Sequence, residues 1–178
     1  MKKILGVLIV LMLVVAMVGC SDDSAQTSGS GSITMGRVNY AAHGDKSFAV
    51  TVVAMDGDTI AGVSIDEFQF MGSDVAEGVP NSDGAFGESY PADMVLGSKT
   101  TNSDYYSEHM AEEAGSTVEL TENYAAIEAY ATGKTISELE EDVNGKSAEE
   151  MTDAVSGATL ADTKGYLESI IAAAKNAE

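Results

Sequence analysis

The sequence is short of cysteine, tryptophan, proline and basic residues. Among its 178 residues there are one cysteine, no tryptophan and two prolines, and nine Lys+Arg stand against 29 Asp+Glu, for a formal net charge of −20. A single cysteine excludes a disulfide framework and any cluster of cysteine metal ligands. The acidity excludes nucleic acid as a partner, because DNA and RNA carry charge of the same sign. The length fits one compact domain with short extensions.

The first twenty residues have the pattern of a secretory signal. Lys2 and Lys3 precede an uncharged stretch, residues 4–18, which is shorter than the roughly 20 residues of a membrane-spanning helix. Val18-Gly19-Cys20 resembles the processing site of bacterial lipoproteins, in which the cysteine sulfur is lipidated and becomes the mature N-terminus. The resemblance implies a lipoprotein signal peptide over residues 1–20 and lipid attachment at Cys20. The alternative is an uncleaved anchor or a buried apolar segment.

The sequence after the signal predicts a linker followed by a folded domain. Residues 21–35 are rich in serine and glycine, which is typical of a flexible linker. Removing the signal takes away two lysines and no acid, so the exported chain is more acidic than the whole one. We expect a domain over residues 36–178, held by an N-terminal lipid at the outer face of the cytoplasmic membrane.

The front of this domain has the pattern of an antiparallel meander. Residues 48–55 are rich in residues that favour strands, and Asp56-Gly57-Asp58 is a hairpin turn signal. We expect the chain to return over residues 59–66, with an extension to residue 71, and an earlier strand over residues 36–42. Residues 72–97 hold both prolines and several glycines and predict a long loop.

The remainder is predicted to be helical. Amphipathic spacing indicates helices over residues 104–114 and 121–132, and Gly133 is placed to end the second. Thr135 with Glu138 and Ser147 with Glu150 form two capping-box patterns, each opening a further helix. A last helix is expected over residues 160–176. Strands followed by helices indicate an α+β fold, a single small domain with an antiparallel β-meander followed by helices.

The most informative segment precedes that last helix. In Asp153-Ala154-Val155-Ser156-Gly157-Ala158-Thr159, the glycine permits a backbone conformation that other residues resist, and Ala158 leaves space around the chain. Thr159 is expected at the helix N-terminus, with Asp162 completing a capping box. Free N–H groups and a partial positive charge at such a terminus suit a phosphate group. A plain helix cap is the alternative interpretation.

Ser156-Gly157-Ala158-Thr159, preceded by Asp153, resembles the flavinylation motif of FMN-binding domains. That family includes subunits of the sodium-pumping NADH:quinone reductase, and exported lipoproteins of the same family take part in extracellular electron transfer. The resemblance implies that a flavin transferase joins FMN to Thr159 through a phosphoester bond. It also implies that Asp153, Ser156, Gly157 and Ala158 form the rest of the recognition motif.

The resemblance extends in outline to residues 36–70 and 153–174, so that residues 72–150 would be a long insertion. It implies a cell-surface redox carrier, rather than an enzyme with a substrate of its own, that takes electrons from a membrane quinone-linked donor and passes them to an external acceptor. A covalent bond would retain an anionic cofactor on an acidic protein. Candidates for contact with the flavin ring are Phe86 and Tyr90, because aromatics in a glycine-rich loop have less core to join, and also Tyr40 and the pair Tyr105-Tyr106.

Two rival functions remain open at this stage. The chain could be an extracellular lipoprotein that binds a ligand or a protein without any flavin, in which case the motif is only a helix cap. The cleaved signal peptide could itself be a signalling product. No metal site is expected, because His109 and Glu113 share a helix face without a third ligand, and His43 is expected to be a solvated residue at a strand end.

Overall fold

The computed structural model describes residues 32–178 except residue 83. The predicted signal peptide, Cys20 and all but the end of the predicted tether lie outside the described residues. In this part of the chain four strands are followed by five α-helices, and one short 3-10 turn lies between the third and fourth strands. The elements are β1 (Ile33–Tyr40), β2 (Ser47–Asp56), β3 (Thr59–Gly72), η1 (Gly87–Ser89), β4 (Met94–Ser98), α1 (Ser103–Ala114), α2 (Leu120–Ala131), α3 (Ile136–Asn144), α4 (Ala148–Ala154) and α5 (Thr163–Lys175).

The strands form one antiparallel sheet in the order β1-β2-β3-β4, which confirms the α+β class and the meander. The two-residue turn Gly57-Asp58 joins β2 to β3, and Gly57 has a φ of 60°, which a residue with a side chain rarely adopts. β3 continues to Gly72, as the predicted extension requires. β1 begins at Ile33, so the predicted tether overlaps the first three residues of the sheet.

One prediction for this part of the chain is wrong. Residues 72–97 are not one long loop, because β4 pairs with the end of β3, from Phe68 opposite Ser98 to Gly72 opposite Met94. β4 has only five residues and contains Gly97, so it carries no alternating pattern that would distinguish it from a loop. The pairing partner, rather than the local sequence, makes this segment a strand.

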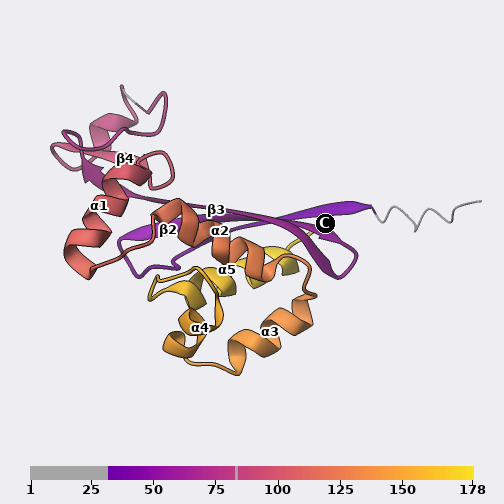
Figure 1. Ribbon diagram of the computed structural model, residues 1–178. Helices are drawn as coiled ribbons and strands as arrows, with labels where there is room; N and C mark the ends of the chain where they lie inside the picture. The colour runs from indigo at the N-terminus through magenta and orange to yellow at the C-terminus, as the bar shows by residue number, and fades with distance from the viewer. Residues whose placement is uncertain (1–31, 83) are drawn as a thin grey trace, which may run out of the picture. The chain divides into compact units, whose positions relative to one another are not determined.

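The helices α2 and α5 lie against one face of the sheet, and α3 and α4 pack on α5 (Figure 1). β2 shows the division clearly, since alternate residues from Ser47 to Met55 are buried and those between them are partly or fully exposed. α5 lies against β1 and β2 and supplies Leu167 and Ile170 to the core, where both are fully buried. The opposite face of the sheet has no covering element among the described residues.

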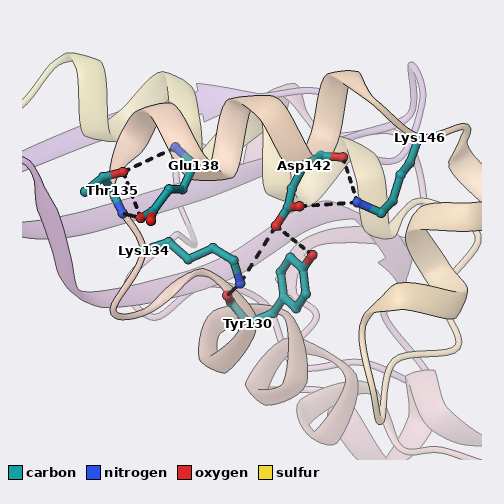
Figure 2. A network of polar contacts seen from close by, with 6 residues as sticks. All are labelled: Tyr130, Lys134, Thr135, Glu138, Asp142 and Lys146. Atoms are coloured by element: carbon teal, nitrogen blue, oxygen red, sulfur yellow. Dashed lines mark hydrogen bonds and ion pairs between the residues drawn. The ribbon is translucent and has the colours of Figure 1, made fainter.

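Both predicted capping boxes are confirmed. The Thr135 side chain accepts a hydrogen bond from the Glu138 backbone N–H at 3.2 Å, and the Glu138 carboxylate accepts one from the Thr135 N–H at 2.8 Å (Figure 2). Ser147 and Glu150 make the same reciprocal pair at the start of α4. Each box satisfies backbone donors that the first helical turn leaves without a partner.

The turn between α2 and α3 is hydrogen-bonded to the start of β3. The Ile60 N–H donates to the Lys134 carbonyl at 2.9 Å, and the Gly133 N–H donates back to the Ile60 carbonyl at 2.8 Å. A side-chain bond also holds the two helices on either side of this turn together, because Tyr130 on α2 donates to Asp142 on α3 at 3.0 Å (Figure 2). The helices of residues 72–150 are therefore integrated with the sheet rather than appended to it.

Candidate functional site

The segment that carries the predicted motif links α4 to α5. Gly157 has a φ of 94°, which confirms that this position needs a residue without a side chain. Ser156 and Thr159 are exposed, whereas Ala158 between them is buried against the core. Asp153 lies exposed in the last turn of α4. The segment thus presents the Thr159 side chain to solvent while Ala158 holds the backbone in place.

Thr159 does not cap a helix, so the predicted capping box with Asp162 is wrong. α5 begins at Thr163, and Asp162 occupies the N-cap position without a side-chain cap bond. The Thr159 N–H donates instead to the side-chain oxygen of Asn123 at 2.6 Å, and the Thr159 hydroxyl lies 3.3 Å from the same oxygen. A tertiary contact has replaced the local cap.

Asn123, on α2, is the residue that positions Thr159, and sequence reasoning missed it. It is fully buried, and its amide nitrogen donates to the carbonyls of Val118 and Glu119 at 3.1 and 3.0 Å. With Thr159 on its oxygen, the Asn123 carboxamide has partners at both ends, as a buried polar group requires. A polar residue in the first turns of a helix is common, so no pattern in the sequence marks it.

We expect Asn123→Ala to loosen the Thr159 segment. The Thr159 N–H would lose its protein acceptor, a contribution of about 1 kcal/mol, so its amide hydrogen exchange should rise by roughly five- to tenfold. Asn102→Ala is the matched control, because Asn102 is also buried and its side chain also hydrogen-bonds to backbone groups, those of Glu77 and Ser98. An equal rise at Thr159 in both variants would contradict this role for Asn123.

Thr159 lies at a cleft of about 390 Å³. That volume falls in the range of small-molecule sites, about 300–1,000 Å³. Its walls come from the β1–β2 loop, the residue after β4, α1, the α1–α2 loop, the start of α2, the Thr159 segment and α5. They are His43, Lys99, Tyr106, Met110, Ala114, Gly115, Ser116, Thr117, Leu120, Thr159, Leu160, Ala161, Asp162 and Tyr166.

The cleft depends on the helices that the sequence resemblance treats as an insertion. Tyr106 and Met110 on α1 and Leu120 on α2 form its apolar wall. Tyr106 and Leu120 are buried, and Met110 is partly buried. Residues 72–150 therefore complete the site at Thr159 instead of standing apart from it.

A buried ion pair lies beside the cleft. Lys99 directly follows β4, Glu67 is on β3, and the two side chains are 1% and 0% exposed. The Tyr166 hydroxyl donates to the same Glu67 oxygen, Oε2, at 2.9 Å, and the Lys99 Nζ lies 4.3 Å from the centre of the Tyr106 ring. The other Glu67 oxygen has no partner within the described part of the protein. Neither Lys99 nor Glu67 stood out in the sequence.

Two tyrosines connect this pair to the rest of the core. The rings of Tyr124 and Tyr166 pack edge to face with centres 5.3 Å apart, and their hydroxyls lie 3.4 Å from each other. Burial raises the pKa of both hydroxyls well above the ordinary value, and the nearby Glu67 carboxylate raises each further. Both tyrosines therefore stay protonated and can serve as hydrogen-bond donors.

His43 is solvent-exposed just after the end of β1, as predicted, and it also pairs with Asp162. Its Nδ1 lies 2.5 Å from a carboxylate oxygen of Asp162, and both residues line the cleft with partly exposed side chains. The sequence separation of the two residues left no local signal for this pair. Asp162 is also the one acidic residue among those lining the cleft.

The structure does not bring Phe86 and Tyr90 to the Thr159 cleft. The two rings pack edge to face with centres 5.4 Å apart, and Tyr90 packs in the same way on Phe70. Tyr90 lines a separate hollow with Val79, Pro80 and Met94. Of the aromatic candidates, Tyr106 is the one that lines the cleft, and Tyr166 joins it without having been predicted.

The described residues hold neither a metal-binding cluster nor a membrane-spanning helix. Over residues 32–178 without residue 83, no three His, Cys, Asp or Glu side chains gather closely enough to hold a metal ion. In the same part of the chain, no helix has both the length and the apolar character needed to cross a bilayer. In comparisons with known proteins, no family model, no curated protein and no solved structure matches this chain.

Proposed function

We propose that this chain is a cell-surface electron carrier with FMN joined covalently to Thr159. One observation carries the proposal: the Ser156-Gly157-Ala158-Thr159 segment holds an exposed threonine on the wall of a cleft that also has aromatic and apolar walls. The hydroxyl supplies an attachment point for the phosphate. The cleft supplies space for the ring of the same molecule.

The residues present suit a flavin. Tyr106, Met110 and Leu120 offer the flat and apolar contacts that an aromatic ring system favours. The lining has a single acid, Asp162, and that acid is paired with His43. The acidity of the chain as a whole is thus absent from the walls of this cleft, and an anionic ligand meets little local repulsion there.

Attachment of the phosphate needs an activated donor. In the proposed reaction a flavin transferase uses a phosphoanhydride of FMN. The bond from the Thr159 oxygen to phosphorus forms, the anhydride P–O bond breaks, and the hydroxyl proton leaves to a base or to water. The second phosphate of the anhydride departs with the rest of the donor. Asn123 helps by fixing the Thr159 backbone, and the exposure of Ser156 and Thr159 leaves the segment accessible to a second protein.

The bound flavin would supply reversible uptake of one or two electrons. The protein would then relay electrons from a membrane quinone-linked donor to an external acceptor, with the lipid on Cys20 and the linker between Cys20 and β1 keeping the domain near the membrane. Those two features belong to the proposal from the sequence, since Cys20 lies outside the described residues.

The decisive test is Thr159→Ala in protein produced together with a flavin transferase. We expect the wild-type protein to keep a fluorescent flavin after denaturing electrophoresis and the variant to lose it completely, because only a covalent flavin survives denaturation. Thr117→Ala is the matched control, since Thr117 is an exposed threonine on the wall of the same cleft. Mass spectrometry of the wild-type peptide containing Thr159 should show added FMN, and an unmodified peptide would overturn the proposal.

A second candidate function is a binding module without a flavin. It is favoured by the sheet face opposite the helices, where Met35, Phe48 and Phe70 are 54%, 39% and 43% exposed. Isolated exposed apolar residues are common, but several on one face can mark a surface for a partner. Thr159→Ala separates the two candidates, because a binding module would keep its function when the hydroxyl is removed.

A further inference from the structure

The Lys99–Glu67 pair is costly for the fold and calls for an explanation other than stability. Two charges removed from water lose much hydration energy, and well-packed apolar residues in their place are often as stable or more so. Here both side chains are almost fully buried, and one oxygen of Glu67 has no partner among the described residues. Because Lys99 also lines the cleft, a role in ligand binding would explain why the pair is there.

The pair is fixed in one arrangement. The backbone joins the two residues as well as the side chains, because the Lys99 N–H donates to the Glu67 carbonyl at 2.7 Å. The Tyr166 hydroxyl holds the carboxylate, and the Tyr106 ring lies beside the ammonium group. A cation held this way keeps its position when a ligand enters the cleft.

Of the two residues in this ion pair, only Lys99 lines the cleft. Lys99, Tyr106 and Tyr166 line it, whereas Glu67 does not. A ligand in the cleft therefore meets the lysine, with the carboxylate behind it. The other charged groups on the cleft wall, Asp162 and His43, are paired with each other and partly exposed. Lys99 is almost fully buried, so water screens its charge least.

We propose that Lys99 binds the electron-rich edge of the flavin in this cleft and raises its midpoint potential. This inference rests on the proposed function. Reduction brings two electrons from a quinol or a chemical reductant and one proton from water to a neutral ring, which leaves one negative charge along the edge that carries N1 and the C2 oxygen. A fixed cation beside that edge stabilises the reduced form more than the oxidised form, so the potential rises.

The test compares midpoint potentials of covalently loaded proteins in a reductive titration. The double variant Lys99→Met with Glu67→Gln replaces the pair by neutral groups of similar size. We expect its flavin to be harder to reduce by at least about tenfold in the reduction equilibrium, or about 30 mV lower for a two-electron couple. Glu67→Gln alone keeps the cation and removes its counter-charge, so its potential should lie above that of the wild type.

Lys134→Met is the matched control. The Lys134 Nζ also lies over a tyrosine ring, 3.6 Å from the centre of Tyr130, and within ion-pair distance of Asp142, but Lys134 does not line the cleft. We expect no change in potential for this variant. Loaded variants of Lys99 and Glu67 with the wild-type potential would overturn this inference and leave covalent flavin at Thr159 intact. A wild-type protein without fluorescence after denaturation would overturn both.

Discussion

Replacing Lys99 alone by methionine should lower the free energy of unfolding by about 3–5 kcal/mol. The methionine fills most of the space of the lysine, so the loss comes from Glu67, whose carboxylate would stay in the core without its cation. The Tyr166 hydroxyl would remain as its one side-chain donor, because the second oxygen of Glu67 already has no partner among the described residues. Denaturation with urea, followed by circular dichroism, measures the change.

The double variant Lys99→Met with Glu67→Gln distinguishes a charge effect from a packing effect. It removes both charges, and the carboxamide that replaces the carboxylate can still accept a hydrogen bond from Tyr166, so most of the stability should return. Equal losses in the single and double variants would show instead that the shape of the lysine side chain matters. This comparison needs no flavin, and its outcome is independent of the proposed function.

Gly36→Ala should destabilise the fold by about 3 kcal/mol, at the upper end of the usual cost of overpacking. Gly36 is buried in β1 beneath α5, and a Cβ atom there would lie 1.9 Å from the carbonyl oxygen of Ala173 and 2.9 Å from the backbone nitrogen of Ala177. Both obstacles are backbone atoms, so no rotation of a side chain can relieve the contact. The strand and the helix would have to separate.

Gly62→Ala provides the control within the same sheet. Gly62 lies in β3, and a Cβ atom there would meet nothing within 4 Å. We expect a neutral or slightly stabilising effect, because alanine restricts the unfolded chain more than glycine does. Thermal unfolding of the two variants should differ clearly. A Gly36→Ala protein as stable as Gly62→Ala would contradict the close approach of α5 to β1.

Local signals predicted the parts of the fold that depend on neighbouring residues. The Gly57 turn, the two capping boxes and the left-handed glycine at position 157 each depend on residues within a few positions of one another. α5 was found from the spacing of its apolar residues, with Leu167 and Ile170 as its buried centre. In each case the physical reason for the structure lies within the pattern itself.

The parts that were missed depend on contacts between distant segments. β4 is a strand because β3 lies beside it, and Thr159 is bound to Asn123, 36 residues away, in place of a local cap. The pairs Lys99–Glu67 and His43–Asp162 likewise join different elements. A single sequence shows which residues could bear charge or donate a hydrogen bond, but it does not show which of them meet.

The packing of α5 on the first strands also determines when folding can finish. β1 and β2 bury their inner face against α5, which follows all four strands in the chain. Until residues 163–175 are available, the sheet has no cover for Val53 and Ala49, both fully buried in the finished protein. Contacts between such distant segments also slow folding. The core of this protein therefore closes only after residues 163–175 have reached the sheet.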